Sequence, residues 1–142
     1  MITRRLFTAL AAGAILSVAA CGSAQTSAPG AAGVAAAAEL GAAAFKERLA
    51  EPGTVILDVR SREEFAEGHL DGAINIDVED PSFAEEIEGL NKSVPYAVYC
   101  RSGNRSQMAI DLMREAGFEN TYHLAGGIGA WSAARYDVVA GP

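Results

Sequence analysis

Short apolar runs alternate with segments of helical spacing along most of this chain, and this alternation limits the possible folds more than any other feature. Residues 55–59 form a short run that is apolar and β-branched, which is typical of a strand buried on both faces of a sheet. The predicted strands cover residues 55–59, 73–76, 96–99 and 121–124. Strands separated by helices pair in parallel, because a long connection returns the chain to the same end of the sheet. We therefore predict an α/β fold of three layers, a small and mostly parallel sheet with helices on both faces.

The segments between these runs carry the signals of helices. Residues 39–50 have apolar residues at helical spacing, and Ser61 with Glu64 matches a capping box at the start of a second helix. Further helices are predicted over residues 81–90 and around Trp131, which we expect in the core. In a helix predicted over 106–116, five residues would share the buried face: Met108, Ala109, Leu112, Met113 and Ala116.

Charge and cysteine content exclude several classes of protein. The chain has 142 residues with 11 Lys and Arg against 18 Asp and Glu, and a formal net charge of −7. Nucleic acid binding is not expected, because phosphates require clustered basic residues. Two cysteines cannot form a disulfide-dense scaffold or a four-thiolate zinc site, and we expect no metal. All the acidic residues lie at Glu39 or later, which predicts one domain over residues 39–142.

Residues 1–20 have the layout of a secretory signal peptide. Arg4 and Arg5 give a basic start, and a short apolar stretch over residues 6–16 follows. This stretch is too short for a hydrocarbon core that needs about 20 residues, so we predict a cleaved signal. Residues 3–7 also resemble the twin-arginine export signal, with the Sec route as the alternative.

The string LSVAAC, which ends at Cys21, resembles the lipobox of bacterial lipoproteins. In that family the cysteine receives a diacylglyceryl group and the chain is cut just before it. The resemblance implies an exported protein, anchored by lipid to the bacterial cell membrane, whose domain faces the periplasm or the cell exterior. An ordinary signal peptide with a chance cysteine is the alternative. The uncharged residues 21–38 predict a flexible tether, or a short edge strand over 34–38.

Cys100 follows a predicted strand, at the edge of the sheet where ligands bind in parallel α/β folds. Backbone N–H groups of the loop after it can converge above the sulfur, and the helix end adds positive potential. Arg101 and Arg105 add positive charge, so we predict a thiolate with a pKa below the value of about 8.5 of a free cysteine. Gly103 and Asn104 tolerate the positive φ of a tight loop. The alternative is a small buried hydrophobic residue.

Residues 100–106 resemble the active-site loop of the rhodanese family. Three other stretches agree: VILDVR resembles the family's first core strand and Asp-x-Arg turn, EGHLDGAINI its Gly-His-Ile/Leu-x-Gly-Ala motif, and GGIGAW its Gly-Gly-x-x-x-Trp motif. Together they cover residues 39–136 in the family's order. The resemblance implies a rhodanese-like fold.

The resemblance also implies a sulfurtransferase that needs no cofactor. The family's cysteine takes the outer sulfur of a donor such as thiosulfate, becomes a persulfide, and passes the sulfur to cyanide or a thiol. Cys100 would be the nucleophile, and Arg101 or Arg105 would attract the anionic donor. The backbone N–H groups that cradle the sulfur would belong to Arg101, Ser102, Gly103, Asn104 and Arg105.

Five further residues have expected positions. Asp58, Arg60 and Ser106 would support the loop rather than react. His69 lies in a motif that the family uses structurally, and His123 is expected to be packed or exposed. Oligomeric state, and the physiological donor and acceptor, are not determined by the sequence.

Two other functions are compatible with such a cysteine. Phosphatases, and the related branch of this fold, place five residues between the cysteine and the final arginine, whereas four separate Cys100 from Arg105. The shorter loop suits one sulfur atom better than a phosphate, which also argues against an arsenate reductase. A membrane-tethered persulfide carrier or thiol sensor would use the same thiolate and remains open.

Overall fold

The computed structural model describes residues 38–141. The predicted signal peptide, the lipid site at Cys21 and the tether up to residue 37 lie outside the described residues. Among the helices of the described part, none is long and apolar enough to cross a membrane.

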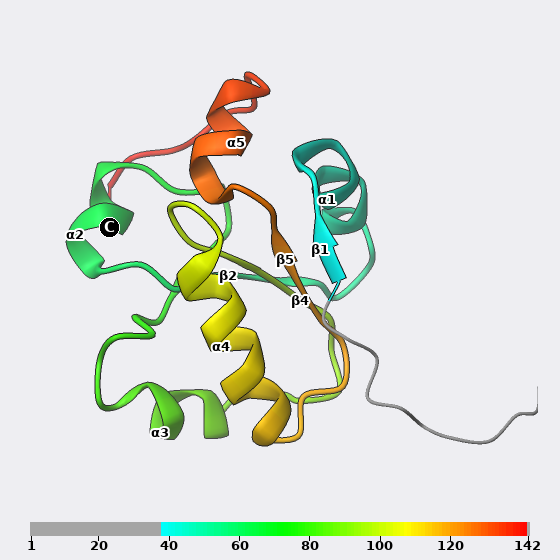
Figure 1. The fold of residues 1–142 in the computed structure, drawn as a ribbon, viewed down its shortest axis with the longest axis vertical. Helices are drawn as coiled ribbons and strands as arrows, with labels where there is room; N and C mark the ends of the chain where they lie inside the picture. The colour runs from blue at the N-terminus through cyan, green and yellow to red at the C-terminus, as the bar shows by residue number, and fades with distance from the viewer. Residues whose placement is uncertain (1–37, 142) are drawn as a thin grey trace, which may run out of the picture. The chain divides into compact units, whose positions relative to one another are not determined.

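A parallel sheet of five strands forms the centre of the domain (Figure 1). The strand order is β1-β5-β4-β2-β3, and every pair of neighbours is parallel. This confirms the predicted α/β fold. The strands are β1 (Ala38–Leu40), β2 (Val55–Asp58), β3 (Ile74–Asn75), β4 (Tyr96–Tyr99) and β5 (Thr121–Leu124).

Helices cover both faces of the sheet (Figure 1). Along β4, Val98 and Cys100 join the core under α3 and α4, whereas Ala97 and Tyr99 join the core under α1 and α5. This alternation of side chains places the Cys100 sulfur on the α3 and α4 side of the sheet. The helices are α1 (Ala42–Leu49), α2 (Arg62–Glu67), α3 (Phe83–Glu88), α4 (Asn104–Glu115) and α5 (Gly127–Ala133).

The capping box predicted for α2 is present. The Glu64 N–H donates to Ser61 Oγ at 3.3 Å, and the Ser61 N–H donates to a Glu64 carboxylate oxygen at 3.4 Å. These two bonds satisfy N–H groups that a helix start otherwise leaves without a partner.

The helix predicted over residues 39–50 was wrong at its start. Ala38–Leu40 forms the edge strand β1, and the helix begins at Ala42. Leu40 pairs with Leu124 in the parallel register, and its carbonyl accepts from the Ala125 N–H at 2.8 Å. Pairing along β5 outweighs the local helix propensity of this segment.

The buried face predicted for α4 was also partly wrong. Met108 and Leu112 are 45% and 36% exposed. The helix also begins at Asn104, two residues earlier than predicted. Its buried residues are Ser106, Ala109, Ile110 and Met113, so the buried stripe is displaced around the helix axis from the predicted one. Packing of α4 against β4 and β5 decides which stripe is covered.

Candidate active site

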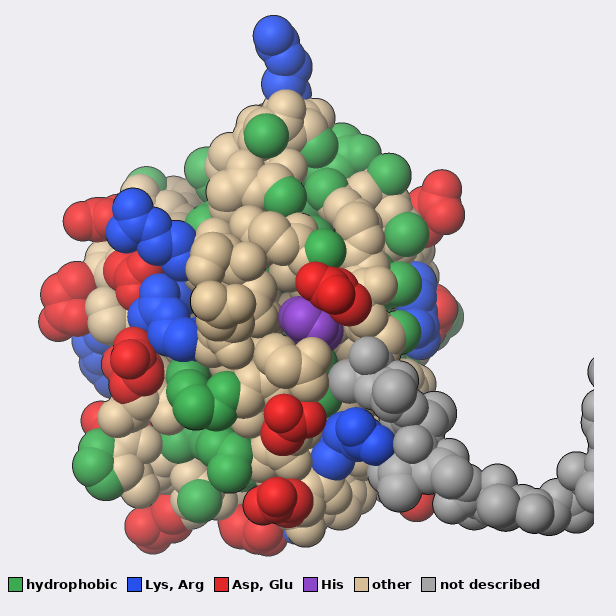
Figure 2. All heavy atoms as spheres, viewed as in Figure 1, with side chains coloured by type: hydrophobic (Ala, Val, Ile, Leu, Met, Phe, Trp, Pro, Cys, Tyr) green, Lys and Arg blue, Asp and Glu red, His purple; other side chains and the backbone are tan. Residues whose placement is uncertain are grey.

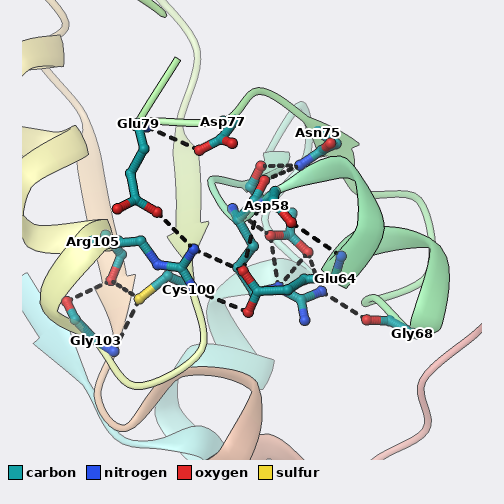
Figure 3. A network of polar contacts seen from close by, with 12 residues as sticks. Asp58, Glu64, Gly68, Asn75, Asp77, Glu79, Cys100, Gly103 and Arg105 are labelled. Atoms are coloured by element: carbon teal, nitrogen blue, oxygen red, sulfur yellow. Dashed lines mark hydrogen bonds and ion pairs between the residues drawn. The ribbon is translucent and has the colours of Figure 1, made fainter.

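Cys100 lies immediately after β4 and is only 1% exposed (Figure 3). Its Sγ accepts a hydrogen bond from the Gly103 N–H at 3.0 Å. The Ser106 hydroxyl lies 3.6 Å from the same sulfur. The loop therefore folds back over the cysteine, so that polar groups from its far end face the sulfur.

Gly103 makes this turn possible. Its φ is 109°, a conformation that residues with a side chain rarely adopt. A Cβ at this position would lie 3.5 Å from the Gly126 backbone nitrogen. Asn104, the other residue predicted to tolerate a positive φ, is instead the first residue of α4.

The surroundings of Cys100 favour its ionised form. Burial by itself would raise the pKa of the thiol. Hydrogen bonds from the Ser106 side chain, and from the backbone N–H groups of Ser106, Gly103 and Ser102, outweigh burial and hold the pKa below its ordinary value. A thiolate attacks sulfur and other soft electrophiles far faster than a thiol does.

The start of α5 holds the loop from the opposite side. The Ile128 N–H donates to the Cys100 carbonyl at 2.9 Å, and the Gly129 N–H donates to the Arg101 carbonyl at 3.4 Å. Gly127 allows this approach, because a Cβ there would lie 2.4 Å from the Cys100 carbonyl oxygen. The carbonyls of Cys100 and Arg101 thus accept hydrogen bonds from α5, whereas the Gly103 N–H donates to the sulfur. From the sequence, the glycine pair was recognised only as part of the GGIGAW motif.

The two loop arginines differ in their surroundings. Arg105 donates to both carboxylate oxygens of Glu64, at 2.7 and 3.0 Å, and to Glu79 at 3.1 Å (Figure 3). These bonds fix α4 to α2 and occupy the Arg105 guanidinium. Arg101 is exposed and forms no side-chain hydrogen bond or ion pair with residues 38–141. Of the two, Arg101 is the cation that is available to an anion at the loop.

Asp58 and Arg60 form a buried ion pair one strand away. The Arg60 Nε lies 2.9 and 3.1 Å from the two Asp58 carboxylate oxygens, and an Arg60 Nη donates to the Gly68 carbonyl at 2.7 Å. The Arg60 guanidinium also lies 5.6 Å from the Tyr99 ring, next to Cys100 in the sequence. The pair therefore connects the end of β2 with residue 68 and with β4, not with the loop after Cys100.

His69 and Trp131 have structural contacts. The His69 ring stacks on Phe65 at 3.7 Å, and its Nδ1 lies 2.9 Å from the Phe65 carbonyl. Trp131 is 6% exposed, as expected of a core residue, and its Nε1 donates to the Asp137 carbonyl at 2.9 Å.

His123 is the functional candidate that sequence reasoning missed. It is 3% exposed on β5, and its Nδ1 lies 3.2 Å from Ser106 Oγ, one hydroxyl away from the sulfur. The strand was predicted, but the pairing of β5 with β4 was not, and that pairing brings the histidine beside the loop.

The cysteine loop can therefore hold a thiolate under backbone N–H donors, with a free cation beside it. Within residues 38–141, no carboxylate contacts the Cys100 sulfur. This arrangement suits nucleophilic attack with retention of a small, electron-rich atom on the cysteine.

Comparisons with known proteins identify a matching family and similar proteins. The model of the Rhodanese-like domain family matches residues 41–134. Thiosulfate sulfurtransferase GlpE from Pseudomonas putida is 37% identical over 83 residues, which are 58% of this chain and 74% of that protein. The crystal structure of a rhodanese-related protein from Thermoplasma volcanium is similar with a TM-score of 0.64 and 30% identity. This similarity covers 72% of this chain and 97% of that one.

A second kind of relative is much longer than the matched region. The tRNA uridine(34) hydroxylase from Acaryochloris marina is 36% identical over 88 residues, 59% of this chain. The chain spans only 28% of that hydroxylase, so the similarity concerns one part of the larger protein.

Proposed function

The chain belongs to the rhodanese-like domain family, and we propose that it is a thiosulfate sulfurtransferase that works through a persulfide on Cys100. The observation that carries the proposal is the hydrogen bond from the Gly103 N–H to Cys100 Sγ inside a closed loop. The relative named thiosulfate sulfurtransferase, at 37% identity, supports the choice of donor.

The reaction divides into two displacements at sulfur. The Cys100 thiolate attacks the outer sulfur of thiosulfate, a new S–S bond forms, and sulfite leaves with the electron pair of the bond that breaks. Cyanide or a thiolate then attacks the outer sulfur of the persulfide. The acceptor leaves as thiocyanate or as a persulfide of its own, and the Cys100 thiolate is restored.

The loop contributes in both steps. N–H groups directed at the cysteine stabilise the negative charge of the thiolate before attack, and that of the departing thiolate after transfer. The free guanidinium of Arg101 attracts the dianionic donor to the loop. Arg105 contributes indirectly, by holding α4 to α2.

Mass spectrometry of the purified domain after thiosulfate treatment tests the proposal. We expect one added sulfur atom on Cys100, its removal by cyanide with formation of thiocyanate, and neither event in Cys100→Ser. Absence of the adduct from the folded protein would refute the persulfide mechanism. An adduct that no acceptor removes would show a carrier, and faster turnover of an aryl phosphate than of thiosulfate would show a phosphatase.

The role of Arg101 has a matched control in Arg135, which is also exposed. We expect Arg101→Gln to raise KM for thiosulfate several-fold, and Arg135→Gln to leave it unchanged, while the stability of both variants stays within about 0.5 kcal/mol of the wild type. Equal KM values for the two variants would contradict a role for Arg101 in donor binding.

We also propose that the protein is exported and anchored by lipid at Cys21. The proposal rests on the resemblance of LSVAAC to a lipobox and on the signal-like residues before it. Protein extracted from bacterial membranes should have an intact mass that begins at an acylated Cys21, and Cys21→Ser should abolish the modification. A soluble product without lipid would refute the anchor.

A further inference from the structure

His123 is a buried imidazole that the sulfur-transfer steps do not use. Its Nδ1 lies 3.2 Å from Ser106 Oγ, whereas its Nε2 is buried and has no hydrogen-bond partner among residues 38–141. A buried nitrogen without a partner is destabilising by about 1–3 kcal/mol, a cost that an apolar side chain would avoid. Since Nε2 forms no hydrogen bond, the contact of Nδ1 with Ser106 is the only polar contact of this ring among residues 38–141.

Ser106 connects the imidazole to the reactive sulfur. Its side chain is fully buried, and its Oγ lies 2.8 Å from the Gly103 carbonyl oxygen and 3.6 Å from Cys100 Sγ. A hydroxyl has one hydrogen to donate and two lone pairs that accept. The single hydrogen can therefore reach only one of three acceptors: the Gly103 carbonyl, the sulfur or an unprotonated His123 Nδ1.

The protonation of His123 decides which acceptors compete. Burial lowers the pKa of His123, and this effect exceeds the opposite influence of Glu39 on β1 and Asp111 on α4. A neutral ring carries one N–H. An N–H at Nε2 would be buried without an acceptor, and such orphan donors are rarer in proteins than acceptors without a donor. The N–H therefore belongs on Nδ1, where Ser106 Oγ accepts it.

We propose that His123 is a positioning residue for Cys100 that acts through Ser106: its Nδ1–H occupies one lone pair of Ser106 Oγ and leaves the hydroxyl hydrogen free for the sulfur. When Cys100 is ionised, the hydrogen turns from the neutral Gly103 carbonyl to the thiolate, because hydrogen bonds to a charged acceptor are the stronger ones. No proton leaves the histidine in this arrangement. The inference rests on the proposed function only in that sulfur transfer requires the thiolate.

The test measures ionisation of the thiol rather than turnover, so that it is independent of the sulfur donor. The rate of alkylation of Cys100 by iodoacetamide is measured as a function of pH in the wild type and in four variants. These are His123→Leu, His123→Asn, Ser106→Ala and the double variant that combines His123→Leu with Ser106→Ala. A rise of one unit in the thiol pKa lowers the thiolate fraction by up to tenfold. We expect alkylation at neutral pH to fall about three- to tenfold in His123→Leu and in Ser106→Ala.

The remaining two variants separate positioning from a general structural effect. Asparagine can place an amide N–H where the histidine has Nδ1–H, so His123→Asn should stay within about twofold of the wild type. The double variant should match Ser106→Ala alone, because His123 acts only through that hydroxyl. Wild-type alkylation in His123→Leu, or reductions that multiply in the double variant, would overturn the proposal.

A measurement on the wild type tests the proposal even if some of the variants fail to fold. Nitrogen NMR of the labelled protein distinguishes the two neutral forms of a histidine ring. We expect the hydrogen of His123 on Nδ1 at neutral pH, and a hydrogen on Nε2 would overturn the proposal even if every variant behaved as expected. If the wild type does not turn over thiosulfate but the alkylation rates follow the expected pattern, only the proposed sulfurtransferase activity is contradicted.

Discussion

Replacement of Gly127 by alanine tests how the start of α5 holds the cysteine loop. The added Cβ would lie 2.4 Å from the Cys100 carbonyl oxygen and 2.5 and 2.6 Å from the Arg101 carbonyl carbon and oxygen. These neighbours are backbone atoms, which cannot move aside as the end of a side chain can. The φ of 57° at Gly127 adds strain, because it lies in the left-handed region.

Two contributions give the magnitude of the effect. A side chain in the left-handed region costs about 1–2 kcal/mol, and overpacking of a filled site costs about 1–3 kcal/mol. Gly127→Ala should therefore lower the free energy of unfolding by about 2–5 kcal/mol. The loop must also shift away from α5, which breaks the bond from the Ile128 N–H to the Cys100 carbonyl. Because a misplacement of about 1 Å in an active site can cost about 100-fold in rate, we expect a loss of sulfur transfer of that order.

Gly129→Ala is the matched control, two residues along the same helix. Its Cβ would lie 3.6 Å from the Arg101 carbonyl oxygen, an ordinary contact. Alanine in a helix interior gains about 0.5–1 kcal/mol over glycine, so this variant should be as stable as the wild type or more so, with normal activity. Urea unfolding monitored by Trp131 fluorescence gives the stability, and thiocyanate formation gives the rate. Equal stability and activity of the two variants would refute the reasoning.

Three further predictions follow from the packing and the charges. Asp58→Asn should lower the free energy of unfolding by about 3–5 kcal/mol, because it leaves the buried Arg60 without its counter-charge; a loss below about 1 kcal/mol in urea unfolding would show that the pair is dispensable. Ile110→Ala should lower the free energy of unfolding by about 2–5 kcal/mol, because Ile110 is buried. Leu112→Ala should change it by no more than about 0.5 kcal/mol, because Leu112 is exposed. The reverse order would support the buried face of α4 that was predicted from the sequence. The hydrogen bonds from Arg105 hold the pKa of Glu64 below its ordinary value, so this carboxylate stabilises the fold above its unfolded pKa, and the contribution is lost as the pH falls through the folded pKa. The difference in Tm between the wild type and Glu64→Gln should therefore close on acidification, and a constant difference would contradict the linkage.

The negative surface charge of the domain affects how an anionic donor approaches the loop. Acidic side chains are spread over the face shown in Figure 2, and all 18 of them belong to the part of the chain from Glu39 onward. Net negative charge repels an anionic donor at long range, and salt weakens this repulsion. The local charge of Arg101 must therefore act close to the loop, which is why its replacement is expected to change KM rather than stability.

Elements with strong local signals could be predicted from the sequence. β4 is a short apolar run, and α2 carries its own capping box, so neighbours along the chain determine both of them. β1 has only three residues, too few for any periodicity, and exists because it pairs with β5. The buried face of α4 depends on how the helix packs against β4 and β5, and apolar spacing alone favoured the wrong stripe.

The sequence by itself determined the candidate reactive centre: a cysteine at the end of a buried strand, followed by a glycine-containing loop and a helix start. The tertiary structure decided how that centre is held. Arg105 is bound to Glu64, 41 positions away, and His123 reaches Ser106 across 17 positions. Spacing along the chain encodes contacts between near neighbours, whereas contacts such as these depend on which strands pair and which helix faces pack. They therefore exist only after the domain has folded.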